Sequence, residues 1–115
     1  MPASQYAITI EEGATFVLTF TVKAGGVAVN LTGYTAQMQV RSTVESSAVI
    51  VEASSANNRV DIQGGTGVVT VTIPANVTST LDFTDGVYDL KATAPGGAVS
   101  RYLAGEVTFS RAVTR

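Results

Sequence analysis

Apolar and polar residues alternate at every second position in several short runs, and this pattern constrains the fold most. The clearest run covers residues 15–23, in which Thr fills most positions between the apolar ones. On an extended strand its apolar residues share one face, and they are Phe16, Leu18, Phe20 and Val22. Val and Thr, the commonest residue types in the chain, are β-branched and favour strands. The run is therefore predicted to be a half-buried β-strand.

The same period of two recurs along the chain. Four further segments show it clearly, at residues 34–42, 69–73, 88–93 and 106–110. Their predicted inward-facing residues are Ala36, Met38, Val40, Val69, Val71, Ile73, Tyr88, Leu90, Ala92, Val107 and Phe109. Weaker strand patterns cover residues 6–10, 27–31, 48–53, 59–63 and 99–103. The pattern predicts about 7–9 strands.

Turn-forming residues separate these runs. Gly, Asn, Asp and Pro supply a positive φ or a preset turn, and they lie at residues 25–26, 57–58, 64–67, 85–86 and 95–97. Only Pro74–Leu81 looks helical, because Pro suits a first helical position and Val77 lies four residues before Leu81. We expect one short helical turn near residues 74–81, crossing between two sheets. The whole pattern predicts an all-β, antiparallel β-sandwich.

Tyr88 sharpens this prediction. Immunoglobulin-type sandwiches often carry a Tyr near the start of the sixth strand, after a helical turn at a corner. Tyr88 follows the 74–81 segment and lies two residues before the inward-facing Leu90. We expect its hydroxyl to bond back to that corner, with Asp85 in the turn, and the alternative is a core Tyr without a special role. Cys and Trp are absent, so the prediction is an immunoglobulin-like sandwich without the antibody disulfide and central Trp.

Length and charge bound the domain organisation and the partners. The 115 residues fit one domain, 1–115, with 1–4 expected to be a loose N-terminal tail. Only 14% of the residues are charged, and the net charge is -2. Nucleic-acid binding needs a clustered basic surface, so we expect no nucleic acid. No apolar run approaches the ~20 residues that cross a bilayer and no secretory signal is visible, so we expect no membrane partner.

The sequence offers few groups for catalysis or metal binding. Cys and His are absent, which removes thiolate nucleophiles, the usual general base and the commonest metal ligand. Asp82, Asp85 and Asp89 are the one acidic cluster, but their spacing is not that of a calcium loop. We therefore predict no enzyme activity and no catalytic, cofactor-binding or metal-binding residues.

Two features point to protein partners. Arg101, Arg111 and Arg115 give a mildly basic C-terminal stretch, and they are candidate contact residues because Arg is enriched at interfaces. The outward strand faces are largely Thr, Ser, Gln and Val, which a partner can cover at low desolvation cost. Such strands also lack the charges that discourage edge pairing. Composition therefore favours a subunit of an assembly over a freely diffusing enzyme.

Several phrases of the sequence, taken in order, resemble a pattern of small tailed-phage virion proteins. They are Asn30-Leu31-Thr32-Gly33-Tyr34 with its continuation to Arg41, then Val49–Val51, Ile73–Leu81, Gly86–Leu90, Val99–Phe109 and Val113–Arg115. The match covers roughly residues 15 to 115. In this pattern the chain is similar to the N-terminal immunoglobulin-like domain of phage baseplate upper proteins. In that family the domain attaches a receptor-binding or fibre component to the virion.

The resemblance implies a non-enzymatic structural or adaptor subunit of a tailed-bacteriophage virion, in the tail, baseplate or fibre-attachment region. The chain would be made in the host cytoplasm, work without a cofactor and be present in multiple copies. Its partners would be tail, baseplate, fibre or capsid subunits. Because no trailing helix, stalk or receptor-binding domain follows Arg115, we expect an adaptor rather than a direct receptor-binding protein.

Two alternatives remain open at the level of sequence. One is a capsid decoration or head-fibre base protein, which would have the same composition. The other is a carbohydrate- or receptor-binding module, which would present exposed aromatic rings. Four aromatic residues are available for such a role, namely Tyr6, Tyr34, Phe83 and Tyr102.

Overall fold

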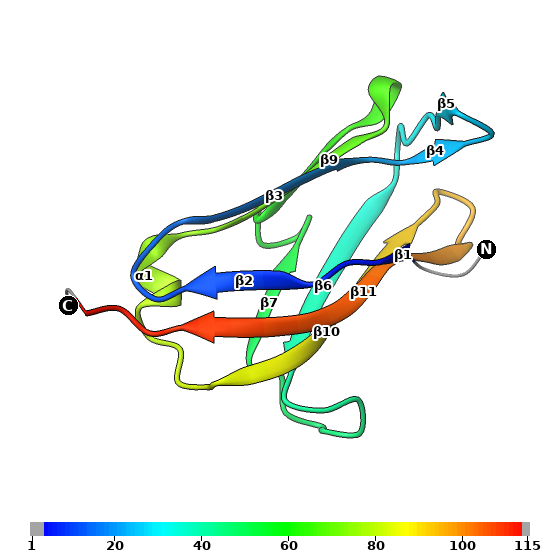
Figure 1. The fold of residues 1–115 in the computed structure, drawn as a ribbon. Helices are drawn as coiled ribbons and strands as arrows, with labels where there is room; N and C mark the ends of the chain where they lie inside the picture. The colour runs from blue at the N-terminus through cyan, green and yellow to red at the C-terminus, as the bar shows by residue number, and fades with distance from the viewer. Residues whose placement is uncertain (1–3, 114–115) are drawn as a thin grey trace.

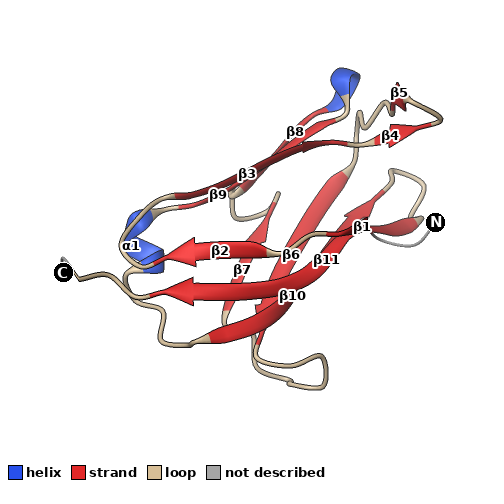
Figure 2. Cartoon of the chain, in the orientation of Figure 1, coloured by secondary structure: helices blue, strands red, loops and turns tan. Residues whose placement is uncertain are grey.

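The computed structural model describes residues 4–113, which form two facing β-sheets (Figure 1, Figure 2). The larger sheet has six strands, in the order β1 (Ser4–Gln5), β11 (Val99–Ser110), β10 (Asp85–Thr93), β6 (Thr35–Arg41) and β7 (Val51–Ser54), and β2 (Ile8–Glu11) also pairs with β11. The smaller sheet contains β3 (Phe16–Thr21), β9 (Val68–Ile73) and β8 (Val60–Gln63). A separate short hairpin pairs β4 (Lys23–Ala24) with β5 (Val27–Ala28).

The two sheets enclose one hydrophobic core built from alternating residues. All of the inward-facing residues predicted for the four clear segments after β3 are buried. In β3, Leu18 is buried, and Phe16 and Phe20 pack against the core while remaining partly exposed. The predicted alternation is confirmed by this burial. Its physical reason is that only every second side chain of a strand can face the other sheet.

The number of strands also agrees with the sequence pattern once the shortest elements are set aside. Residues 4–113 contain eleven strands, of which β1, β4 and β5 have only two residues each. The eight longer strands fall within the predicted range. They are antiparallel to their neighbours except at the N-terminal edge of the larger sheet.

The predicted helical turn is present as α1 (Ala75–Thr78), and it connects β9 of the smaller sheet to β10 of the larger one. Pro74 precedes its first residue with an extended backbone. Thr78 is completely buried, and its hydroxyl donates to the carbonyl oxygen of Ala14 at 2.9 Å. This bond ties the crossover to the loop between β2 and β3, another connection between the two sheets.

The N-terminal segment closes one edge of the larger sheet. β1 and β2 both run parallel to β11 (Figure 1), with Ser4 opposite Leu103 and Ile8 opposite Val107. Ser4 is therefore part of a strand, and the prediction of a loose tail over residues 1–4 is wrong at this position. Residues 1–3 lie outside the described part of the chain.

The two strand patterns expected near the C-terminus form a single strand, β11, which contains a bulge. Its register with β10 shifts, because Leu90 is opposite Leu103 but Lys91 is opposite Arg101. Tyr102 is the extra residue. Side chains alternate along a strand, so the bulge turns Arg101 to the outer face with Lys91, whereas unbroken alternation would turn it inward with Leu103.

Asp85 and Gly86 are the first two residues of β10, and the turn expected at this dipeptide is wrong. Asp85 is exposed and lies opposite Thr108. A Cβ atom on Gly86 would come within 2.5 Å of the carbonyl oxygen of Arg41. The glycine is required by the close approach of two strands and not by a positive φ.

Candidate functional site

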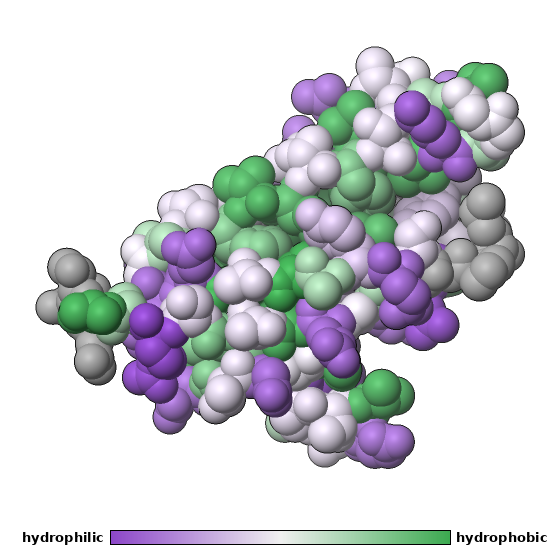
Figure 3. All heavy atoms as spheres, in the orientation of Figure 1, coloured by the Kyte–Doolittle hydropathy of each residue, from purple (hydrophilic) through white to green (hydrophobic). Residues whose placement is uncertain are grey.

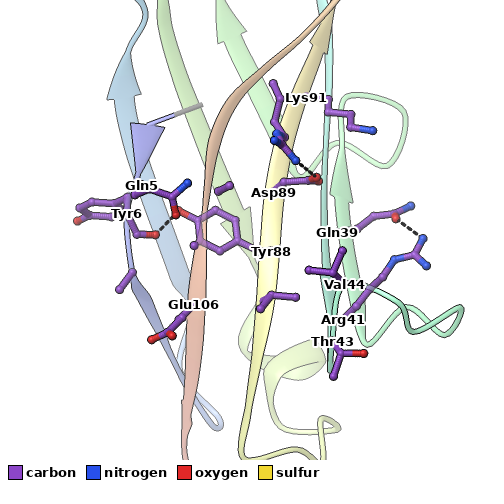
Figure 4. A pocket seen from close by; sticks show the side chains of 15 residues that line it. Gln5, Tyr6, Gln39, Arg41, Thr43, Val44, Tyr88, Asp89, Lys91 and Glu106 are labelled. Atoms are coloured by element: carbon purple, nitrogen blue, oxygen red, sulfur yellow. Dashed lines mark hydrogen bonds and ion pairs between the residues drawn. The ribbon is translucent and has the colours of Figure 1, made fainter. Parts of the chain in front are cut away.

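The outer face of the six-stranded sheet has a hollow of about 680 Å³ (Figure 4). Strands β6, β10 and β11 form its floor, and the N-terminal segment and the loop after β6 also line it. The strand register sets side chains from three strands in rows across the sheet. One row contains Arg41, Val87 and Glu106, and the next contains Gln39, Asp89 and Ala104.

A polar network fixes the side chains on the β6 side of this hollow. The Arg41 guanidinium donates to Gln39 Oε1 at 2.8 Å, and Gln39 Nε2 donates to Glu52 Oε1 at 3.0 Å. The amide of Gln37 donates to the same carboxylate oxygen of Glu52. The bonds from Gln39 and Gln37 to the ionised carboxylate lower the pKa of Glu52. The face therefore presents fixed polar groups of both charge signs.

Tyr88 contacts the N-terminal segment and not the helical corner. Its side chain is buried, and its hydroxyl donates to the carbonyl oxygen of Tyr6 at 2.6 Å (Figure 4). The expected bond to the corner and the expected place of Asp85 in a turn are thus wrong, because Asp85 lies in β10. Burial, with a smaller effect from Tyr6, raises the pKa of Tyr88 to about 12.

Gly105, which the sequence pattern did not single out, completes this contact. The amide of Tyr6 donates to the carbonyl oxygen of Ala104 at 2.9 Å, which brings the N-terminal backbone onto β11. A Cβ atom on Gly105 would lie 2.3 Å from the Tyr6 carbonyl oxygen. A glycine inside a strand signals such an approach, but the sequence does not say which segment approaches.

The structure does not bring the predicted arginines together. Arg101 lies near the start of β11, with its guanidinium 3.7 Å from the Asp89 carboxylate. Arg111 follows the end of β11, and its guanidinium lies 3.4 Å from Glu12 and 3.3 Å from Asp82. The two arginines are ten residues apart in an extended segment, or about 33 Å at the rise of a strand. Arg115 lies outside the described residues. The two described arginines thus each form an ion pair within the chain.

Neither a cluster of metal-ligating side chains nor a helix long and apolar enough to cross a membrane occurs in the described residues. Residues 4–113 have no group of three or more acidic side chains close enough to hold a metal ion. Asp82 pairs with Arg111, and Asp89 pairs with Arg101. Within the same residues, no helix has the length and apolar character needed to span a bilayer.

Most aromatic side chains belong to the core. Tyr88 and Phe109 are buried, and Phe83 stacks on Phe109 with ring centroids 4.6 Å apart. Tyr34 and Tyr102 are partly buried and pack against the core. All the aromatic residues of the chain lie in the described part, and Tyr6, at 53%, is the one classed as exposed.

The outer surface of the three-stranded sheet has a different composition. Its outward-facing positions are Val17, Thr19, Thr21, Asp61, Gln63, Val68, Thr70 and Thr72. Asp61 is the single charged residue among these positions of the three described strands. By contrast, the outer face of the six-stranded sheet carries Glu11, Arg41, Glu52, Asp85, Asp89, Lys91, Arg101 and Glu106. Of the charged side chains on the outer faces of the two sheets, all but Asp61 therefore lie on the six-stranded sheet.

Comparisons with known proteins identify the fold. No family model and no curated protein matches the chain. A solved structure of the extracellular domain of the voltage-gated sodium channel beta4 subunit aligns over 98% of this chain and 97% of that chain, with a TM-score of 0.52 and 12% identity. The chain has an immunoglobulin-like β-sandwich fold. At this identity the likeness extends to the fold alone.

Two further solved structures have lower similarity. A voltage-gated sodium channel beta subunit aligns over 97% of this chain and 98% of that chain, with a TM-score of 0.46 and 13% identity. A chain from the complex of ICOS with ICOS-L and an anti ICOS-L VNAR domain aligns over 96% of this chain and 56% of its own, with a TM-score of 0.45 and 13% identity.

Proposed function

We propose that the chain is a non-enzymatic structural or adaptor subunit of a tailed-phage virion, which binds neighbouring subunits through the outer face of the three-stranded sheet. The observation that supports this proposal is the distribution of charge between the two sheets. Around Thr70 and Thr72, the outer face of the smaller sheet offers hydroxyl and methyl groups. A partner can cover such groups without removing an ion from water, a step that is costly for Lys or Glu.

The fold is compatible with a role in protein contact. The sodium channel beta4 domain, which shares it, is described in parallel homodimers with a role in cell–cell adhesion. The virion location of the present chain comes from the sequence resemblance to phage baseplate upper proteins. A capsid decoration or head-fibre base protein would use the same kind of surface, and the position of the chain in the particle distinguishes the two locations.

The test uses particles produced from the genome that encodes the chain. Peptide mass spectrometry of purified particles should detect the chain, and antibody labelling in electron micrographs should place it at the tail or at the head. Absence of the chain from purified particles would overturn the proposal. This measurement does not depend on which face of the sandwich makes the contact.

A pair of variants then tests the face. Thr72→Lys puts a charge on the central strand of the smaller sheet, and Gln37→Lys puts the same charge on an exposed outward position of β6. We expect Thr72→Lys to lower incorporation into particles at least about tenfold, because the ammonium must be desolvated in the contact. Gln37→Lys should be incorporated like the wild type. Equal incorporation of both variants would exclude the proposed face.

The carbohydrate-binding alternative has less support from the geometry. A platform for sugar stacking needs exposed rings, and Tyr34, Phe83 and Tyr102 are packed against the core. Tyr6 is exposed, but its ring points away from Tyr88 (Figure 4). Specific binding on a glycan array that disappears in Tyr6→Ala would favour this alternative over the adaptor role.

A further inference from the structure

Strand β3 is an edge strand with one side unpaired in the described structure. It forms six pairs with β9, from Phe16 opposite Ile73 to Thr21 opposite Val68, and the register has no bulge. The sheet order places β3 at the end of the three-stranded sheet. Sheet edges are normally protected by charges, prolines, bulges or short strands. Residues 15–22 contain no charge and no proline, so β3 has none of these protections.

The other edge strands are better protected. Strands β2, β7 and β8 have four residues each. Each also contains one acidic residue, namely Glu11 in β2, Glu52 in β7 and Asp61 in β8. The contrast singles out β3 as the edge that can accept another strand.

The hydrogen bonds to β9 determine which backbone groups of β3 face outward. The amide of Val22 donates to the carbonyl oxygen of Gly67 at 2.8 Å, next to the Thr21–Val68 pair. Bonded and non-bonded pairs alternate in an antiparallel ladder. Phe16, Leu18 and Phe20 therefore bond to β9. By the same alternation Val17, Thr19 and Thr21 direct their N–H and C=O groups toward the open edge.

The side chains beside this edge are also suited to a strand partner. Val17 is 58% exposed, and Thr19 and Thr21 are exposed on the outer face. On the inner face Phe16 and Phe20 are only partly covered by the core. Figure 3 shows hydrophobic residues gathered in the middle of the view, between the positions that β3 and β2 have in Figure 1. An added strand would cover both the backbone groups and this apolar margin.

We propose that β3 pairs antiparallel with β3 of a second copy of this chain, about a twofold axis at Thr19, so that the two three-stranded sheets become one continuous sheet. Thr19 then lies opposite Thr19 of the second copy, and Val17 lies opposite Thr21. The backbone groups of these three residues face the open edge, so each of the pairs that they form can exchange two backbone hydrogen bonds. The inner-face pairs are Leu18 with Phe20 and Phe16 with Val22, which are all apolar.

The edge is thus complementary to itself in its backbone hydrogen bonds and in its apolar inner-face pairs, and it has no charges that would repel a second copy. An isologous dimer requires this self-complementarity. A foreign extended segment would satisfy the backbone groups equally well, but only the second copy is guaranteed to supply the matching apolar alternation. The dimer does not depend on the virion location, because it is measured on the isolated chain.

Opposite charges at the twofold axis give the decisive test. In a Thr19→Lys dimer the two ammonium groups would lie directly opposite each other, and like charges there are destabilising. Analytical ultracentrifugation of the wild type should show a dimer at about 100 µM. Thr19→Lys and Thr19→Asp should each weaken it at least about tenfold. An equimolar mixture of the two variants should recover a heterodimer.

Two controls keep the test interpretable. Thr9→Lys places the same charge on β2, another edge strand, where Thr9 is exposed, and this variant should dimerise like the wild type. Circular dichroism should show that all three variants remain folded. A wild type that stays monomeric at about 1 mM, or a dimer that Thr19→Lys leaves unchanged, would overturn the proposal. A mixture that fails to recover a dimer would exclude the axis at Thr19.

Amide hydrogen exchange gives an independent readout of the backbone pairing. The amides of Leu18 and Phe20 should be protected at all concentrations, because they bond to β9. Those of Val17, Thr19 and Thr21 should become protected only as the protein concentration rises. Protection of this second set that does not depend on concentration, or none at all, would contradict the strand pairing.

Discussion

The two sheets of this sandwich treat their edges in opposite ways. In the larger sheet the N-terminal segment adds β1 and β2 to β11, and the Tyr88 hydroxyl holds that segment through the Tyr6 carbonyl oxygen. In the smaller sheet β3 lies at the edge in the described structure and has no charge. The outer side of β11 is thus covered by the chain itself, whereas the outer side of β3 is unpaired in the described residues.

The distribution of charge follows the same division. Eight charged side chains, three basic and five acidic, lie on the outer face of β2, β6, β7, β10 and β11, whereas Asp61 is the one charge on the outward positions of β3, β8 and β9. A surface that carries charges is costly to dehydrate, while one of Thr and Val is cheap to cover. The small number of charged residues therefore matters because it leaves the outer face of the smaller sheet almost without charge.

The largest expected effect comes from breaking the closed edge at Gly105. Its Cβ atom would lie 2.3 Å from the Tyr6 carbonyl oxygen, so Gly105→Ala must displace backbone. We expect a loss of about 2–3 kcal/mol in the free energy of unfolding, measured by urea denaturation. The matched control is Gly65→Ala, where a Cβ atom meets nothing within 4 Å. A loss no larger than that of the control would mean that the N-terminal segment is not held against β11.

Removal of the Tyr88 hydroxyl should have a smaller effect on the same edge. Tyr88→Phe leaves the Tyr6 carbonyl oxygen without this donor, which should lower the free energy of unfolding by about 1–2 kcal/mol. Hydrogen exchange should show faster exchange at Tyr6, because its pairing with β11 weakens. Tyr6→Phe is the control, since it keeps the backbone carbonyl that accepts the bond and should remain near the wild-type stability.

Alkaline pH should weaken the closed edge in a defined window. The pKa of Tyr88 rises from 10.0 to about 12 in the folded protein, so the unfolded chain loses this proton first. The contribution of this group to stability is fully present below pH 10 and is lost as the pH rises through about 12. Urea denaturation in this range should show a decline that Tyr88→Phe lacks. An identical decline in both proteins would assign it to other groups.

The smallest effect is expected on the charged outer face. Arg101 and Asp89 form an exposed pair at 3.7 Å, and Arg101→Ala should cost only about 0.5 kcal/mol. The difference from the wild type should shrink as salt is added, because screening weakens exposed pairs. Denaturation at low and high salt measures it. A loss of unfolding free energy as large as that of Gly105→Ala would contradict this prediction and show that the exposed ion pair is important for stability.

Much of the sandwich follows from local pattern. The alternation in residues 15–23 and in the later runs identified the buried residues correctly, because a period of two leaves one face for the core. Pro74 and the spacing of Val77 and Leu81 located the helical turn for equally local reasons. The resemblance to phage baseplate upper proteins stays a prediction that the virion experiment tests.

The site depended on contacts between distant segments, which pattern could not reveal. Tyr88 was recognised as special, but its hydroxyl bonds to Tyr6, 82 residues away. Gly86 resembled a turn residue, although a neighbouring strand is what excludes its side chain. Arg101 was named as a contact residue, but only the bulge at Tyr102 decides that it faces outward.

By itself the sequence determined an antiparallel β-sandwich, its core and the scarcity of charge, because these depend on residue type and on spacing along one strand. The tertiary structure alone decided that the charges collect on the larger sheet, that the N-terminal segment closes its edge, and that β3 remains open. Sheet order and register bring together residues that are far apart in the chain, and the hydrogen bonds that fix them are properties of strand pairs. No single strand contains that information.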